Sequence, residues 1–406
     1  CLPKTAWPPT ETISRRVSAL SPSATLAMSS KSAELRASGV DIINMAVGEP
    51  DFDTPHHIKE AAKRAIDDNF SHYSPVQGYL SLRRAICDNL LSANGLEFTP
   101  EQIVVGNGAK QELSNAVLTL VNPGDEVIIP TPAWVSYVEM VKLAGGVPVE
   151  LYAPMEQGFK ITPAQLEEAI TERTVLLMLN TPSNPTGAIY SRTELAALAA
   201  VLERHPQVFV LSDEIYGHIN FGGRVHSLCE FAEVRDRVVL VNGVSKAYAM
   251  TGWRIGYLAA AQPVADAVAK LQSQTTSGAS SIAQKAAEAA YLGPQTCVSE
   301  MCGVFRRRRD LIVSLATGVE GWRVSEPQGA FYLFPDVSAL LGRRFGDRVI
   351  RSSEDYALFL LEEARVATVA GEAFRAPGHI RLSFATSDRN IREAMRRIAD
   401  ATLRLR

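Results

Sequence analysis

Short apolar runs alternate with amphipathic segments along the middle of the chain. Between residues 103 and 259 the runs are rich in Val, Ile and Leu, and most of the intervening segments carry apolar residues at helical spacing. Seven runs predict strands, at 103–105, 126–129, 147–151, 174–179, 208–212, 238–241 and 255–259. Four segments predict helices, at 110–121, 134–143, 163–171 and 191–204. Strands alternating with helices of this length predict an α/β fold with a mostly parallel sheet covered on both faces.

The two ends of the chain carry mixed patterns, which predict a smaller α/β domain beside the large one. Further helices are predicted at 13–39, 57–68, 80–92, through the long region 262–292, and at 354–365 and 389–404. Short strands are predicted at 41–47, 329–334 and 379–385. The turn-rich stretch 48–55 is expected to cross between the domains. The predicted division is a tail at 1–12, a small domain at 13–50 and 301–406, and a large domain at 51–300.

Composition and charge are those of an ordinary globular protein. The 406 residues are 46% hydrophobic and 21% charged, with a formal net charge of −3 at pH 7. This charge provides no general attraction to nucleic acid or to an anionic membrane, and no apolar run approaches the roughly 18 residues of a membrane-spanning helix. We therefore expect a soluble, cytoplasmic protein. The basic run 306–309 is interpreted as a solvated face at the domain junction, with anion binding as the alternative.

The cysteines indicate free thiols. There are five, at positions 1, 87, 229, 297 and 302, and no two form a Cys-x-x-Cys pair. An odd, scattered set predicts neither a disulfide framework nor a zinc site, so no metal is expected. The first twelve residues lack both a starting Met and the apolar core of a signal peptide, and the fold prediction leaves them out.

Polar and aromatic residues follow the carboxyl ends of five predicted strands. Ligands of open parallel sheets bind beyond those ends, so the loops are expected to meet at one edge. In chain order, the loops hold Gly106-Asn-Gly-Ala-Lys110, then Trp134, then Asn180 to Gly187 with Asn184, then Asp213 with Tyr216, and finally Ser245 with Lys246. The first of these loops opens a helix, whose free N–H groups can hold a phosphate.

Lys246 is the residue around which these loops are interpreted. It lies just beyond the apolar run 238–241, where loss of hydration makes its ammonium form costly and lets the neutral amine attack an aldehyde carbon. Ser245 and Arg254 supply a hydroxyl and a guanidinium suited to a dianionic phosphate. A reactive lysine beside a phosphate site suggests pyridoxal 5'-phosphate (PLP). Taken alone, Lys246 would be better explained as a solvated loop lysine.

The other loop residues have chemical reasons to surround such a cofactor. A carboxylate keeps the pyridine nitrogen protonated, and Asp213 is the candidate. Asn184 and Tyr216 can hydrogen-bond the phenolate oxygen, and Trp134 can stack on the ring. Taken alone, the segment Asp213-Glu-Ile-Tyr216 would be better explained as the start of a helix, whose N-terminus an acidic residue stabilises.

Taken together, six sequence words resemble the fold-type I, class I PLP-dependent aminotransferases, in the branch of the prokaryotic-type aspartate and aspartate/prephenate aminotransferases. Each word alone is weak, but six in this order are specific, and the resemblance runs from about residue 13 to the end. The words are Ala46-Val-Gly-Glu-Pro-Asp-Phe-Asp-Thr-Pro55, Asn107-Gly-Ala-Lys-Gln111, Ser183-Asn-Pro-Thr-Gly187, Ser212-Asp-Glu-Ile-Tyr216, Val244-Ser-Lys-Ala-Tyr-Ala-Met-Thr-Gly-Trp-Arg-Ile-Gly-Tyr257 and Ile380-Arg-Leu-Ser-Phe-Ala385.

The resemblance implies a role for each matching residue. Lys246 would form the Schiff base and move the proton, with Asp213 and Tyr216 as the other catalytic residues. The remaining cofactor ligands would be Gly108, Ala109, Lys110, Trp134, Asn184, Ser245 and Arg254, joined by Tyr73 reaching into the neighbouring subunit. The substrate ligands would be Gly48, Lys110, Trp134, Asn184 and Arg381, with Arg381 holding the α-carboxylate. The family forms homodimers with sites at the subunit interface, so a homodimer is implied as well.

The substrate is the least determined part of this interpretation. A transaminase for aspartate and 2-oxoglutarate must bind a second carboxylate, and a buried carboxylate needs a cationic partner. Lys110 is the candidate, because in this branch the matching lysine faces the distal carboxylate; residues 22–25 would add donors if they close over the site. Lys110 could instead be solvated or balance the cofactor phosphate. Prephenate, which some members of the branch accept, could use the same lysine.

Three other functions compete with an aspartate transaminase. A transaminase for aromatic or neutral amino acids, or a PLP lyase, would share the cofactor site, so the sequence separates them only weakly. A nucleotide-dependent ATPase or dehydrogenase is disfavoured because 106–110 is not Gly-x4-Gly-Lys-Ser/Thr and no Gly-x-Gly-x-x-Gly follows a strand. A binding module without catalysis would be expected to have lost Lys246 or Asp213, and both are present.

Overall fold

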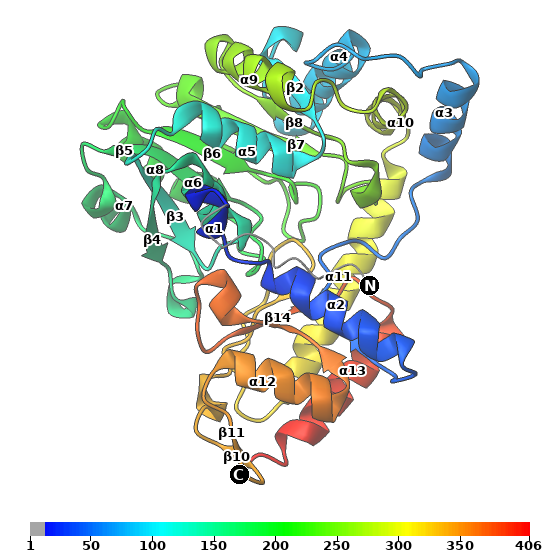
Figure 1. The fold of residues 1–406 in the computed structure, drawn as a ribbon, viewed down its shortest axis with the longest axis vertical. Coiled ribbons are helices and arrows are strands. Elements are labelled where there is room, and N and C mark those ends of the chain that lie inside the picture. The colour runs from blue at the N-terminus through cyan, green and yellow to red at the C-terminus, as the bar shows by residue number, and fades with distance from the viewer. Residues whose placement is uncertain (1–12) are drawn as a thin grey trace, which may run out of the picture.

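The computed structural model describes residues 13–406, which form two lobes connected along one side by the long helix α11 (Thr296–Ala316) (Figure 1). Residues 1–12, predicted as a tail, lie outside the described residues. Within the described part, none of the helices combines the length and apolar character needed to cross a membrane. The four cysteines of that part are free, as predicted.

A seven-stranded sheet forms the centre of the larger lobe. Its strands, in spatial order, are β2 (Ile103–Gly106), β8 (Gly256–Ala259), β7 (Val238–Gly243), β6 (Phe209–Asp213), β5 (Thr174–Asn180), β3 (Glu126–Thr131) and β4 (Val147–Tyr152). All neighbours pair in parallel except β8, which is antiparallel to both β2 and β7. The predicted α/β fold with a mostly parallel sheet is confirmed.

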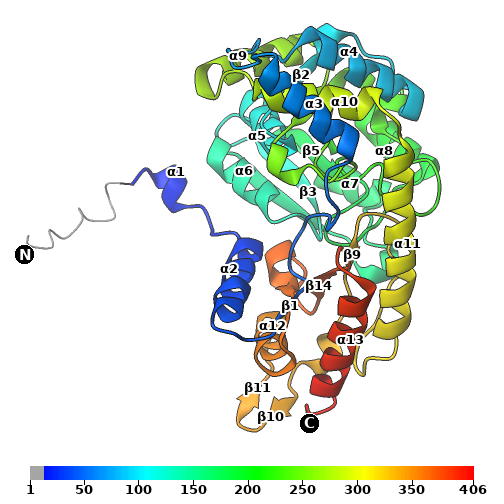
Figure 2. The ribbon, with the colours of Figure 1, turned by 90° about the vertical axis from the view of Figure 1, so that its right-hand side faces the viewer.

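Helices cover both faces of this sheet, because its strands are apolar on both sides. One face packs under α5 (Ala109–Leu120), α6 (Ser136–Ala144) and α9 (Gln262–Thr275). The other packs under α4 (Leu80–Asn89), α8 (Arg192–Glu203) and α10 (Ser281–Leu292), with α3 (His56–Asp67) and α7 (Pro163–Ala169) at its margins. Because β5, β6 and β7 are parallel, their carboxyl ends lie at one edge of the sheet. Figure 2 shows the larger lobe above the smaller one, with α11 extending along both.

The smaller lobe combines short strands with helices around its own aromatic core. Its three-stranded sheet consists of β13 (Val369–Ala370), β14 (Ile380–Ser383) and β9 (Tyr332–Leu333), all antiparallel. Beside it, β1 (Ile43–Asn44) pairs with β12 (Val366–Ala367), and β10 (Arg344–Phe345) pairs with β11 (Arg348–Val349). Its helices are α2 (Ala24–Ala37), α12 (Ser353–Phe359), α13 (Asp388–Thr402) and the C-terminal half of α11. The predicted strand at 41–47 is therefore only two residues long.

Two predicted continuous helices are interrupted. The helix expected at 13–39 is α1 (Arg15–Ser18) followed by α2. Pro22 disfavours a helical residue before it, and Ser23 begins α2 by accepting a bond from a first-turn N–H. The backbone N–H of Ser21 reaches Glu139 of α6 at 2.9 Å, so this break holds residues 21–23 against the larger lobe.

The region expected as one helix from 262 to 292 is divided into α9 and α10. Gly278 lies between them, and a Cβ there would come within 2.3 Å of the Ser74 hydroxyl oxygen. Ser277, with φ +59°, takes a left-handed conformation that cannot continue α9, and the N-cap Ser280 starts α10 anew.

The basic run 306–309 is only partly a solvated face, so that interpretation is wrong for two of its residues. Arg308 and Arg309 are buried on α11. Arg308 donates two hydrogen bonds to Asp51, at 2.7 and 2.9 Å, and Arg309 pairs with Glu326 at 2.7 Å. Asp51 belongs to the stretch that crosses between the lobes, so Arg308 fixes α11 to the crossing rather than facing water.

Candidate active site

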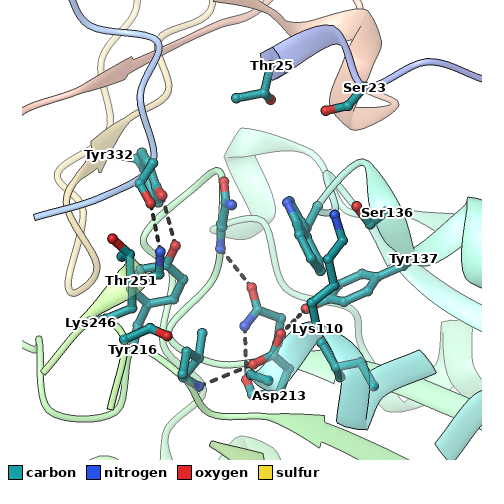
Figure 3. A pocket seen from close by; sticks show the side chains of 18 of the residues that line it. Ser23, Thr25, Lys110, Ser136, Tyr137, Asp213, Tyr216, Lys246, Thr251 and Tyr332 are labelled. Atoms are coloured by element: carbon teal, nitrogen blue, oxygen red, sulfur yellow. Dashed lines mark hydrogen bonds between the residues drawn. The ribbon is translucent and has the colours of Figure 1, made fainter. Parts of the chain in front are cut away.

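A cavity of about 280 Å³ lies where the carboxyl edge of the large sheet meets the smaller lobe. Figure 3 shows Lys246, Tyr216 and Tyr332 on one side of it, Lys110, Ser136 and Tyr137 on the other, and Asp213 at its base. The loop residues predicted to meet at one edge of the sheet do so: Ala109, Lys110, Trp134, Asn180, Asn184, Asp213, Tyr216, Ser245, Lys246 and Arg254 all line this cavity.

Lys246 lies just past the end of β7, and its amine is held by the crossing stretch. Its Nζ donates a hydrogen bond to the Gly48 carbonyl oxygen at 2.7 Å. Desolvation lowers the pKa of Lys246 to about 8; Glu49 opposes that shift, while Arg254 and Arg381 add to it. A substantial fraction of the amine is consequently neutral near pH 8, as a nucleophilic amine requires.

Asp213 ends β6 at the base of the cavity and is fully enclosed. Its carboxylate accepts from the Tyr137 hydroxyl at 2.6 Å and from the Ile215 backbone N–H at 3.2 Å. Burial nevertheless raises the pKa of Asp213 to about 6, and the two hydrogen bonds offset only part of this effect. A cationic group inside the cavity would supply the charge partner that this carboxylate lacks.

Arg381, on β14 of the smaller lobe, is a buried cation that spans the two lobes. One terminal nitrogen donates to Asn184 Oδ1 at 2.9 Å and the other to the Ala46 carbonyl oxygen at 2.7 Å. Its Nε has no hydrogen-bond partner, and no carboxylate within residues 13–406 pairs with it. Because arginine stays protonated, this site is short of one anion.

The opposite end of the cavity is suited to a phosphate. Helix α5 begins there, and its N-cap Gly108 has φ +88° and no side-chain cap. A Cβ at Gly108 would come within 2.3 Å of Arg254 Nη2, so only glycine lets the guanidinium approach the helix start. Together with the hydroxyl of Ser245, these groups concentrate positive potential and donors at one point.

The mouth of the cavity carries Lys110 and the N-terminal segment. The Lys110 amine lies 5.0 Å from the centroid of the Trp134 ring. Ser23 and Thr25 line the same cavity from above (Figure 3). Trp134 itself packs edge-on against Tyr137, with ring centroids 5.5 Å apart.

Two predicted site residues do not line the cavity. Gly108 supports it indirectly, through the contact with Arg254. Tyr73 is 99% exposed and borders a different surface cavity, with residues 278–282. No part of this chain's own site therefore uses Tyr73, which is consistent with a role toward a second subunit.

Sequence reasoning missed three residues that the structure brings to the site. Tyr137 bonds Asp213, and its position at the start of the segment predicted as a helix at 134–143, close to Trp134, was an available signal. Tyr332 bonds Tyr216 at 2.8 Å across the lobes, and nothing in its local sequence indicates this. Glu112 is buried on α5 behind the phosphate end, and neither of its oxygens has a hydrogen-bond partner in the described part of the chain.

Comparison with known proteins gives concordant matches. The family model described as "Aminotransferase class I and II" matches residues 40–398. The chain is 50% identical over 389 residues to the aspartate/prephenate aminotransferase of Cereibacter sphaeroides, covering 95% of this chain and 97% of that protein.

Two solved structures share the whole architecture. The aspartate aminotransferase from Rhizobium meliloti superposes with a TM-score of 0.94 and is 42% identical, covering 97% of this chain and 99% of that one. The aspartate aminotransferase from Thermus thermophilus solved with maleate has a TM-score of 0.90 and is also 42% identical, covering 96% and 99%.

The enclosed Glu112 predicts a pH-dependent stability. Burial raises its pKa from 4.5 to about 8, so between these values the folded state holds a proton that the unfolded state has released. Stability should therefore fall as pH rises from about 5 to 8, by at most roughly 1.4 kcal/mol per pH unit. Glu112→Gln should remove this component, as measured by denaturant unfolding of both proteins from pH 5 to 9. The exposed Glu233→Gln is the control, and an unchanged pH dependence in Glu112→Gln would contradict the assignment.

Proposed function

This chain belongs to the class I and II aminotransferases, and we propose that it uses PLP to transfer the amino group of L-aspartate to 2-oxoglutarate, giving oxaloacetate and L-glutamate. The observation that carries this proposal is that one cavity holds both the Lys246 amine, whose pKa burial lowers to about 8, and the Arg381 guanidinium, whose Nε has no partner among the described residues. The first suits an aldehyde, and the second suits the α-carboxylate that all amino acids share.

The cavity has the donor set that PLP requires. The start of α5, Ser245 and Arg254 would hold the phosphate, and the Asp213 carboxylate would hold the pyridine nitrogen. When bound, PLP supplies an electron sink for the substrate bond that breaks. A charged pyridine nitrogen would in turn favour the ionised form of Asp213, which burial alone disfavours.

The remaining cofactor ligands would position the ring. Asn184 and Tyr216 lie where their amide and hydroxyl can face the phenol oxygen, and Trp134 offers its ring face. Tyr73 would bind the phosphate of a partner in a homodimer, since it is fully exposed on its own chain.

The chain's own residues can then divide the work of transamination. Arg381 orients the substrate through its carboxylate, with Asn184 and the Gly48 backbone beside it. Lys246, no longer committed to the cofactor once substrate binds, would take the proton from the substrate α-carbon and return it to the carbon of the cofactor's aldehyde group, because a pKa of about 8 lets it both accept and release protons.

Lys110 is our candidate for the distal carboxylate of aspartate. It lies at the cavity mouth over Trp134, with Ser23 and Thr25 nearby as donors. The name of the Cereibacter relative supports prephenate as a second substrate. The side-chain carboxylate of prephenate would bind the same lysine. The substrate of a transaminase for neutral or aromatic amino acids has no second carboxylate to pair with this cation.

The cofactor proposal predicts where PLP becomes attached. The purified protein mixed with PLP should absorb visible light, and borohydride should leave a pyridoxyl group on Lys246, seen by peptide mass spectrometry. Lys246→Ala should lose the label and nearly all activity, whereas Lys270→Ala, which removes an exposed lysine of α9, should keep both. A label on another lysine, or no label at all, would refute the proposal.

The substrate proposal predicts a selective defect. Lys110→Ala should raise the KM for aspartate about 10- to 100-fold, the effect of losing roughly 1.5–3 kcal/mol from a charge pair. The KM for alanine or phenylalanine should change little, because these amino acids carry no second carboxylate. Steady-state kinetics with a panel of amino donors, with prephenate tested as an acceptor, measures this. Lys142→Ala, on neighbouring α6 but paired with Glu139, is the control. Equal losses for both classes, or a wild type that prefers alanine, would overturn the dicarboxylate assignment alone.

A further inference from the structure

Tyr332 lies where the two lobes meet over the cavity. It belongs to β9 of the smaller lobe, and its side chain is completely buried. Its hydroxyl oxygen is 2.8 Å from that of Tyr216, which belongs to the larger lobe. The same hydroxyl lies against Gly48, where an added Cβ would be 2.8 Å away. Tyr332 is therefore in contact with both the cofactor side of the cavity and the stretch that holds Lys246 (Figure 3).

The number of protons decides which phenol donates. Each tyrosine has one hydroxyl proton, and neither hydroxyl has another hydrogen-bond partner among residues 13–406. If Tyr216 donated, the proton of Tyr332 would remain buried without an acceptor, which is costly. Both side chains line the cavity, but only Tyr216 keeps accessible surface, 4% against 0% for Tyr332. If Tyr332 donates, the proton of Tyr216 is therefore free to point into the cavity. An acceptor in the cavity then satisfies both hydroxyls.

Arg381 favours the same direction of donation. Its guanidinium carbon lies 4.4 Å from the centroid of the Tyr332 ring, which fixes the ring and draws electron density from the phenol. Burial raises the pKa of Tyr332, and Arg381 opposes that rise. The other charged groups facing the pair are Asp213 from β6 and Lys246 from the loop after β7.

We propose that Tyr332 is a positioning residue for the transamination, donating its hydrogen bond to Tyr216 and thereby directing the Tyr216 proton onto the phenol oxygen of bound PLP. This inference rests on the proposed use of PLP. A hydrogen bond from Tyr332 to Tyr216 strengthens the hydrogen bond that Tyr216 donates, because each hydroxyl polarises the next. Tyr332 would in this way act on the cofactor through Tyr216.

The test is the pH midpoint of the visible absorbance of the PLP-loaded enzyme, which reports how well the phenolate is stabilised. Tyr332→Phe keeps the ring under Arg381 and removes only the hydroxyl. It should raise the midpoint by about 0.3 to 1 pH unit, the size of one hydrogen bond. It should lower kcat several-fold while the KM for aspartate stays within about twofold, since Arg381 keeps its partners. Tyr356→Phe, which removes another buried hydroxyl, far from the cavity and bonded to Trp322 and Thr402, should leave the midpoint unchanged.

A double-mutant cycle separates action through Tyr216 from a general effect. Tyr216→Phe should itself raise the midpoint, and adding Tyr332→Phe to it should produce no further shift. An unchanged midpoint in Tyr332→Phe, or an undiminished shift in the Tyr216→Phe background, would overturn the inference while leaving the aminotransferase intact. A wild-type protein that binds no PLP would instead refute the proposed function. Thermal unfolding of each variant shows whether it has folded.

Discussion

A buried guanidinium without a carboxylate partner is the constraint on which the site depends. Arg381 is completely buried, donates only to an amide and a backbone carbonyl, and leaves its Nε unsatisfied. Burying such a charge costs free energy unless an anion pairs with it. Because its two hydrogen-bond acceptors come from Asn184 of the larger lobe and from Ala46, just before the crossing stretch, the same cation also holds together the elements that enclose the cavity. In the proposed function, substrate binding and the assembly of the lobes therefore share one interaction.

The reactive amine depends on the same junction. Lys246 belongs to the larger lobe, yet its hydrogen-bond acceptor is Gly48 of the crossing stretch. That stretch is fixed three residues later, where Asp51 accepts two bonds from Arg308 of α11. The Arg308–Asp51 pair thus supports the stretch that covers Lys246, whose pKa desolvation lowers to about 8. This role explains why Arg308 is buried in what reads as a solvated basic run.

Sequence patterns predicted the large sheet almost strand by strand, because strands buried on both faces are continuous apolar runs. The same patterns predicted which loops lie together at one edge of that sheet. The patterns failed where tertiary contacts decide local structure. Gly278 against Ser74 divides a helix, Pro22 and the Ser21–Glu139 bond divide another, and Arg308 is buried by Asp51, distant in sequence. The site residues missed had the same cause: Tyr332 meets Tyr216 only through the packing of two lobes.

The proposed transamination requires the amino group of the substrate to stay with the enzyme between two half-reactions. This can be measured in a half-reaction, in which the PLP-loaded protein is mixed with L-aspartate and no oxo acid. We expect one equivalent of oxaloacetate per chain, no free ammonia, loss of the visible absorbance, and recovery of that absorbance with formation of L-glutamate when 2-oxoglutarate is added. Continuous release of ammonia, or no oxaloacetate from the loaded protein, would contradict it.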